Sequence, residues 1–185
     1  MRERGQATNV LGTGATAVIV VNNVAGDPGG ITNYGISLRF LQEHQLDVND
    51  DGEVDARDIR GLTHDQAADI YRRFFWMANG YDHVDDQTLA TKIFDICVNA
   101  GPKRAHILLQ RALNALGCKV DEDGQLGPGT WAAMRGTPPA ALTQALVKAQ
   151  QDFYRNLVAE KPQLAKFLAG WLKRAGWPNS SPATA

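Results

Sequence analysis

The sequence has little net charge, few cysteines and no long apolar run, and each shortage excludes a class of protein. Its 19 basic residues nearly balance 20 acidic ones, for a formal net charge of −1. That balance argues against a general nucleic-acid-binding surface, which needs a basic excess or stripe. No segment approaches the ~20 apolar residues of a membrane-spanning helix. We therefore expect a soluble monomer that binds no nucleic acid and has no membrane span.

The two cysteines and the N-terminus give few signals of their own. Cys97 and Cys118 lack the spacing of metal ligands, and the sequence leaves open whether they pair; two free thiols are the default in a reducing compartment. Two arginines precede the apolar run "AVIVV" at 17–21, but the run is shorter than the core of a signal peptide and no clean cleavage site follows. We expect synthesis in the cytoplasm without a clear signal peptide.

Most of the chain has the apolar spacing of helices, so we predict a mainly α fold. The expected helices begin near Ile36 and Thr63 and then cover 86–101, 103–117, 130–136, 139–160 and 162–176. Residues 1–25 are glycine-rich and then β-branched, which favours a strand or irregular structure over a helix. The polar tail at 178–185 is expected to be disordered.

The loop "DVNDDGEVDARD", residues 47–58, has the pattern of a calcium site. Calcium takes six to eight oxygen ligands, and a twelve-residue loop supplies them from positions 1, 3, 5, 7, 9 and 12. Those positions are Asp47, Asn49, Asp51, Glu53 (through its backbone carbonyl), Asp55 and Asp58. Gly52 occupies position 6, where the loop must turn sharply, and Val54 at position 8 can point into the core. We predict a structural calcium ion here.

The alternative for this loop is an acidic, solvated connector between two helices, which is what most charge runs are. The last ligand position holds Asp58 rather than the usual glutamate, and its shorter arm would weaken the site or favour a smaller ion.

The stretch "DPGGITNYGIS" at 27–37 resembles glycoside hydrolase family 108, the lysozyme-like N-acetylmuramidases of bacteria and their phages. That family carries Glu-Gly-Gly-Tyr, a short spacer, and then Asp-Pro-Gly-Gly-x-Thr-x-x-Gly-Ile. The resemblance continues through "LTHDQAADIYRRFFW", "FDICVNAG", "AHILLQRALNALG", "DGQLGPGTW", "QDFYRNL" and "FLAGWLKR", and so covers about 21–175.

The resemblance implies a lysozyme-like helical domain followed by a type-3 peptidoglycan-binding module, of the secretion-activator or phage-endolysin type. On this basis we divide the chain into an uncertain N-terminal segment (1–25), a lysozyme-like lobe (26–90), a helical peptidoglycan-binding lobe (91–177) and a tail (178–185). The implied partner is bacterial peptidoglycan, at the cell wall or in the periplasm.

The resemblance also implies which residues do the chemistry. Cleavage of a β-1,4 glycosidic bond needs a carboxylic acid that protonates the leaving oxygen and a second polar group that holds water or stabilises the developing charge. Asp27 and Thr32 match the second role in the family. Asn33 and Tyr34, beside them, and Asp95 and Asn99, in "FDICVNAG", are the candidate substrate-binding residues. Asp95 and Asn99 are also i, i+4 neighbours that could merely cap the next loop.

One departure from the family concerns the general acid itself. The family's glutamate stands nine residues before the position of Asp27, where this chain has Val18. Valine cannot donate a proton. Either hydrolysis is lost, or the N-terminal segment is replaced, or another acid such as Glu43 or Glu53 has taken over. Loss of a general acid costs about 10²–10⁴ in rate.

Two further features allow both a purely structural and a functional interpretation. "DEDGQLGPGT" at 121–130 could bind glycan, although an Asp-Gly turn before a helix is commonly only a turn. Trp131 and Trp171 are expected in the core, although an exposed indole would suit a saccharide. The four histidines lack ligand spacing and are expected to be structural or solvated.

Three functions remain open from the sequence. The first is a peptidoglycan-cleaving muramidase, impaired to the extent that Val18 replaces the acid. The second is a non-catalytic peptidoglycan-binding protein with the same fold. The third is a calcium-stabilised helical adaptor that shares only the architecture.

Overall fold

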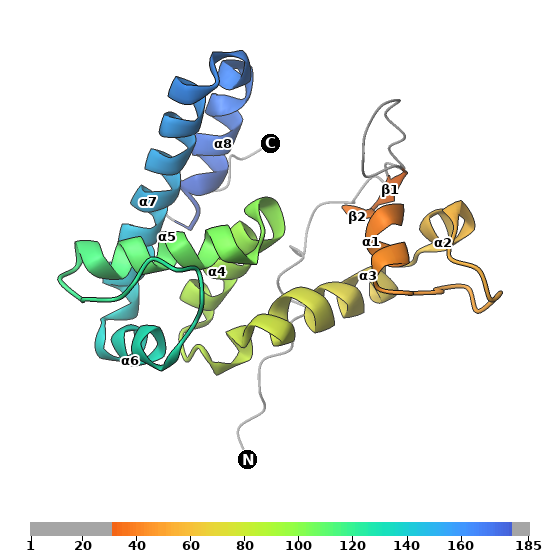
Figure 1. Ribbon diagram of the computed structural model, residues 1–185, viewed down its shortest axis with the longest axis horizontal. Helices are drawn as coiled ribbons and strands as arrows, with labels where there is room; N and C mark the ends of the chain where they lie inside the picture. The colour runs from red at the N-terminus through yellow and green to blue at the C-terminus, as the bar shows by residue number, and fades with distance from the viewer. Residues whose placement is uncertain (1–30, 179–185) are drawn as a thin grey trace. The chain divides into compact units, whose positions relative to one another are not determined.

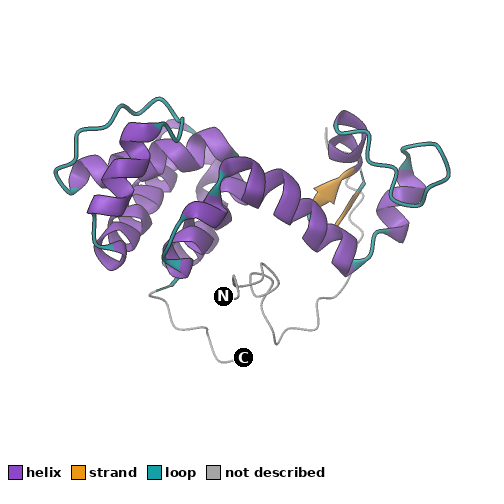
Figure 2. Cartoon of the chain, turned by 90° about the horizontal axis from the view of Figure 1, so that it is seen from below, coloured by secondary structure: helices purple, strands orange, loops and turns teal. Residues whose placement is uncertain are grey.

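The computed structural model describes residues 31–178. It divides the chain into two compact units, with the boundary between Phe74 and Phe75. The described part is mainly helical, as predicted, and Figure 2 shows its two short strands in the first unit. The predicted lobe boundary at residue 90 falls inside helix α4 (Gln87–Ala100) and stays a prediction. No helix in residues 31–178 is both long enough and apolar enough to cross a membrane.

The first unit begins with a two-stranded hairpin and continues in short helices. Its elements are β1 (Thr32–Asn33), β2 (Ile36–Ser37), α1 (Leu38–Glu43), α2 (Ala56–Gly61) and α3 (His64–Tyr71). The prediction that a helix begins at Ile36 is wrong by two residues, because Ile36 pairs with Asn33 and the side chain of Ser37 caps the first turn of α1. Thr63 is the N-cap of α3, as expected, in a capping box with Gln66.

A small apolar core joins these elements. Its buried members are Ile31, Ile36, Leu41, Ile59, Leu62, Ala67 and Ile70. Val54 packs against this core from the loop at 47–58, which confirms the direction expected for position 8. A π-helical turn (Arg72–Trp76) follows α3.

The second unit is a helical assembly. It contains α4, α5 (Pro102–Ala115), α6 (Pro128–Gly136), α7 (Pro139–Glu160) and α8 (Leu168–Ala175), and 3-10 turns at Met77–Asn79, Tyr81–His83 and Pro162–Phe167. Helices α5, α6 and α7 each have proline in the first turn, where the missing N–H costs nothing. A single helix was expected over 162–176. Its first six residues instead form a 3-10 turn, and only the second half is α-helical.

Helix α4 packs against α5 and α7 (Figure 1). Ile93 and Ile96 on α4, Leu108 and Leu109 on α5, and Leu146 on α7 are fully buried. Cys97 is buried and Cys118 half-buried, and both are free thiols. Trp131 and Trp171 are only half-buried, so the expectation that they belong to the core is wrong.

Candidate active-site lip and calcium-type loop

The hairpin of the first unit is a tight turn that few residues could form. Tyr34 and Gly35 have φ angles of 50° and 79°, the left-handed values that a two-residue type I′ turn requires. Glycine is needed at 35 because a Cβ there would lie 2.7 Å from the Tyr71 hydroxyl. The Tyr71 hydroxyl donates to the Tyr34 carbonyl at 3.0 Å, and this bond holds Tyr34 in its unusual backbone conformation. The turn is thus fastened to the end of α3.

Asn33 fastens the other side of the hairpin. Its side chain is 1% exposed, and its amide donates to the carbonyls of Ile59 at 2.9 Å and Leu62 at 3.4 Å. These carbonyls are at the C-terminal end of α2, where helix carbonyls lack partners within the helix. The geometry gives Asn33 a supporting role, and its predicted contact with substrate stays a prediction.

Thr32 and Tyr34 are the more accessible of the predicted site residues in the hairpin. Both side chains are half-buried, and the Tyr34 ring lies edge-on to His64 with centroids 6.0 Å apart. Thr32 pairs with Ser37 across the two strands. Asp27 and Val18 lie outside the described residues, so their predicted roles are not placed by the structure.

The loop at 47–58 is folded compactly by hydrogen bonds between its own side chains and its backbone. Oδ2 of Asp47 accepts from Gly52 N–H at 2.7 Å, and Oδ1 of Asn49 accepts from Asp51 N–H at 2.9 Å. Oδ1 of Asp51 accepts from Glu53 N–H at 3.0 Å. The backbone turns at Gly52, with φ 89°, which is the sharp bend that position 6 was expected to make.

Asp58 closes the loop from its far end. It is 1% exposed and accepts from Val48 N–H at 2.8 Å and Asp55 N–H at 2.8 Å. Asp55 is the N-cap of α2 and forms a capping box with Asp58. The carboxylate of Asp58, at the twelfth position, therefore joins the second and ninth positions of the loop.

Arg57 gathers the exposed carboxylates of the loop. Its guanidinium lies 2.8 Å from Asp51, 2.8 Å from Glu53 and 3.0 Å from Asp55. The pKa of Asp55 is lowered, first by the hydrogen bond from Arg57 N–H and also by the guanidinium. No group of three or more metal-ready side chains is assembled among residues 31–178. Oδ1 of Asp47 nevertheless is buried without a hydrogen-bond partner, which is the kind of atom a cation would satisfy.

Asp95 and Asn99 lie together on α4, in the second unit. Asn99 donates from its amide to the Asp95 carbonyl at 2.6 Å, within the helix. Oδ1 of Asp95 accepts from the Arg174 guanidinium at 2.7 Å, which joins α4 to α8. Asp95 thus has a structural partner 79 residues away that spacing along the sequence could not indicate. Its predicted contact with substrate, and that of Asn99, stay predictions.

The second unit contains a buried series of linked hydrogen bonds that the sequence did not predict. The Tyr81 hydroxyl donates to Nε2 of His106 at 2.9 Å, and Nδ1–H of His106 donates to the Gly124 carbonyl at 3.0 Å. The carbonyl can only accept, so it fixes the proton on Nδ1. Burial lowers the pKa of His106 and keeps the ring neutral. The only sequence signal was a histidine on the apolar face of a helix, which indicates burial but not its partners.

Comparisons with known proteins match the chain in two consecutive parts, and the border between these parts falls between α4 and α5 rather than at Phe74. The family described as "Glycosyl hydrolase 108" matches residues 20–101, and the family described as "Predicted Peptidoglycan domain" matches residues 104–176. The solved structure of SagA from Brucella abortus is 25% identical, with a TM-score of 0.61, over 88% of this chain and 89% of that chain. A search of curated protein sequences finds no match.

Proposed function

The chain is a lysozyme-like protein of the glycosyl hydrolase 108 family with a C-terminal peptidoglycan domain, and from this we propose that it is an N-acetylmuramidase that cleaves β-1,4 bonds of the bacterial cell wall. The observation that carries the proposal is the pair of family matches, one for hydrolysis and one for the wall, in consecutive parts of one chain. The protein acts as a monomer, at the cell wall or in the periplasm.

In this proposal the hairpin presents Thr32 at the lip of the active site, and Asp27 shares its role. The two side chains hold the attacking water or stabilise the positive charge that develops on the sugar ring. The fastening of the hairpin by Asn33 and Tyr71 supports this role, because a catalytic group must be held within a fraction of an ångström of its working position.

The chain has no acidic residue at the position where the family has its proton donor. Val18 stands at the family position of the acid. Glu43 lies 2.7 Å from the Arg39 guanidinium and Glu53 lies 2.8 Å from that of Arg57, so both carboxylates already have ion-pair partners. Hydrolysis is therefore slow, and the second candidate function is non-catalytic binding of peptidoglycan by the same fold.

Clearing of a suspension of purified cell walls separates these two functions. The muramidase proposal predicts slow clearing, and Val18→Glu is expected to accelerate it by about 10²-fold or more by restoring the acid. A matched control is Val18→Gln, because glutamine is similar to glutamate in size and polarity but cannot act as the general acid. No clearing by either the native chain or Val18→Glu, with the fold intact by circular dichroism, would leave the binding function in its place.

We also propose that the loop at 47–58 holds a structural calcium ion. The ligand set is the oxygens of Asp47, Asn49, Asp51, Asp55 and Asp58 and the backbone carbonyl of Glu53, which suit a hard cation. The buried, unpartnered Oδ1 of Asp47 supports the fit. Arg57 now neutralises three of the outer carboxylates, so calcium would compete with it.

Thermal unfolding in calcium and in EDTA tests this site. At a calcium concentration 100 times the Kd, binding adds about 2.7 kcal/mol and raises Tm by roughly 5–10 °C. Asp47→Asn keeps the shape of the side chain and removes its charge, and is expected to abolish most of the difference. Asp65→Asn changes an exposed carboxylate outside the loop and is the control. It is expected to keep the difference in Tm between calcium and EDTA. Equal melting curves of the native chain in calcium and EDTA would reject the site.

A further inference from the structure

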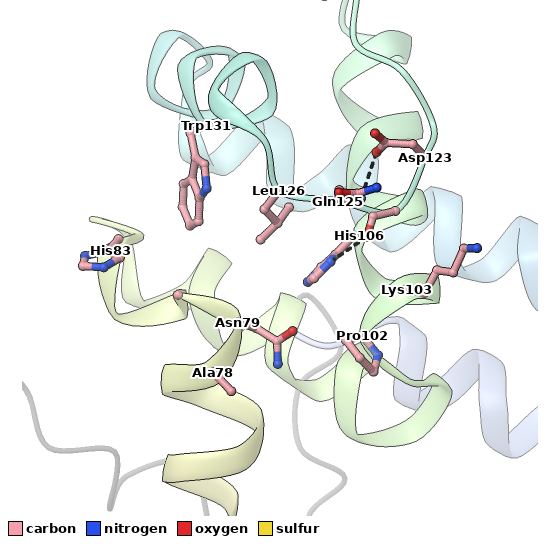
Figure 3. A pocket seen from close by; sticks show the side chains of 12 residues that line it. Ala78, Asn79, His83, Pro102, Lys103, His106, Asp123, Gln125, Leu126 and Trp131 are labelled. Atoms are coloured by element: carbon pink, nitrogen blue, oxygen red, sulfur yellow. Dashed lines mark hydrogen bonds between the residues drawn. The ribbon is translucent and has the colours of Figure 1, made fainter.

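The second unit contains an open pocket that none of the predicted site residues lines. It has a volume of about 620 Å³ and is bordered by the 3-10 turns after Trp76, the start of α5, the loop at 123–126 and Trp131 of α6 (Figure 3). Pockets that bind small ligands commonly have 300–1,000 Å³ and combine apolar walls with a few fixed polar groups. All the residues that line this pocket belong to one compact unit.

Trp131 provides a flat apolar wall. Figure 3 shows its indole extending from α6 into the pocket, near Leu126 and His83. The indole packs so closely over Gly80 that a Cβ there would lie 3.3 Å from its ring, which fixes the position of the aromatic face. A pyranose ring has one face of C–H groups, and a half-exposed indole is a suitable surface for that face.

The polar groups of the pocket carry balanced charge. Its lining has one lysine, Lys103, and one carboxylate, Asp123, and the neutral His106 lies on the same helix as Lys103 and is bonded to the Gly124 carbonyl. Asn79 donates one amide proton to the Phe75 carbonyl at 2.8 Å, and Figure 3 shows its side chain at the pocket. A neutral ligand rich in hydroxyl and amide groups matches this set better than an anionic peptide, which Asp123 would repel.

The loop that forms one wall is held rigidly before any ligand binds. Gln110 of α5 donates to Asp123 Oδ1 at 2.8 Å and to the Gln125 carbonyl at 2.9 Å, and accepts from Gly124 N–H at 2.9 Å. Gly124 has φ 78°, and a Cβ there would lie 2.8 Å from the Lys103 side chain. A preformed wall reduces the entropy lost on binding.

We propose that this pocket binds the glycan strand of peptidoglycan, with an N-acetylated hexosamine stacked on Trp131 and its hydroxyl and acetamido groups bonded to Asn79 and Asp123. The inference rests on peptidoglycan as the substrate class but not on hydrolysis. It also gives the Asp-Gly turn of "DEDGQLGPGT" a function beyond turning the chain.

Calorimetric titration of the full chain with the β-1,4-linked tetramer of N-acetylglucosamine tests the proposal. Trp131→Leu keeps apolar bulk and removes the flat face, and is expected to weaken binding about tenfold or more, as the loss of a central aromatic contact does. Trp177→Leu is the matched control, because Trp177 is 38% exposed and lies outside the pocket. Its affinity is expected to equal that of the native chain.

An NMR titration keeps the test decisive if Trp131→Leu does not fold. On addition of the tetramer, the indole N–H signal of Trp131 is expected to shift and that of the buried Trp76 to stay. The proposal is overturned if the native chain does not bind the tetramer, if Trp131→Leu binds it equally well, or if only the free stem peptide binds. Failure of cell-wall clearing alone would count against the muramidase and leave this binding site intact.

Discussion

Lys92 offers a quantitative test of how the second unit is held together. Its side chain is fully buried on α4, and Nζ donates to the Ala175 carbonyl at 2.8 Å, at the last residue of α8. Burial lowers the pKa of Lys92 to about 8 from 10.5, with nearby Asp95 opposing the shift and Arg174 adding to it. The native state therefore holds a costly charge at neutral pH.

The sign and size of the pH effect follow from this pKa. Between about pH 8 and pH 10.5 the unfolded chain binds more protons at Lys92 than the folded chain does, so stability from this group rises with pH. The full difference is about 3 kcal/mol, of which about 2 kcal/mol is gained between pH 7 and pH 9.5. Lys92→Met keeps the length of the side chain and should lack that gain.

Urea unfolding of both proteins at pH 7 and pH 9.5 measures the effect. The change of unfolding free energy with pH is expected to be about 2 kcal/mol more favourable in the native chain than in Lys92→Met. Subtracting the two pH differences removes the contribution of the other titrating groups. An identical pH dependence in the two proteins would refute the description of Lys92 as a buried ammonium.

Three other predictions concern the hairpin, the loop and the buried histidine. Gly35→Ala is expected to destabilise the fold by about 2 kcal/mol in urea unfolding, from left-handed strain and the displaced Tyr71 hydroxyl, whereas Gly61→Ala, with no atom within 4 Å of its new Cβ, should change little. Arg57→Gln should lower Tm in EDTA and enlarge the rise in Tm on adding calcium, since the loop carboxylates lose their competing cation; an unchanged calcium response would contradict that competition. Because the folded pKa of His106 lies below 6.5, the native chain should lose stability as pH falls through 6.5, and His106→Gln should lose less of it between pH 7 and pH 5 by thermal unfolding.

Local signals in the sequence predicted the helices of the second unit closely. The expected ranges 86–101 and 139–160 correspond to α4 (Gln87–Ala100) and α7 (Pro139–Glu160), because glycine and proline mark their ends. The hairpin was missed, since its type I′ turn has tyrosine at a position that asparagine or glycine usually occupies. That tyrosine is held by Tyr71, 37 residues away, and no local pattern contains such a contact.

The candidate site was predictable to the extent that its chemistry is local. The calcium-type loop could be proposed from the sequence because its oxygen-bearing positions and Gly52 follow a fixed spacing, and the ion itself stays a prediction. The partners of Asp95 and Lys92 could not, because Arg174 and Ala175 reach them only after α8 packs on the unit. The pocket beside Trp131 was missed for the same reason: its walls come from four separate segments that only the fold brings together.

Incubation of the chain with purified peptidoglycan sacculi tests binding and hydrolysis together, with sedimented protein and released reducing ends measured in the same sample. The chain is expected to sediment with the sacculi and to release reducing ends slowly, and Val18→Glu is expected to release them faster at equal binding. A folded chain that remains in the supernatant and releases no reducing ends would contradict a function on peptidoglycan.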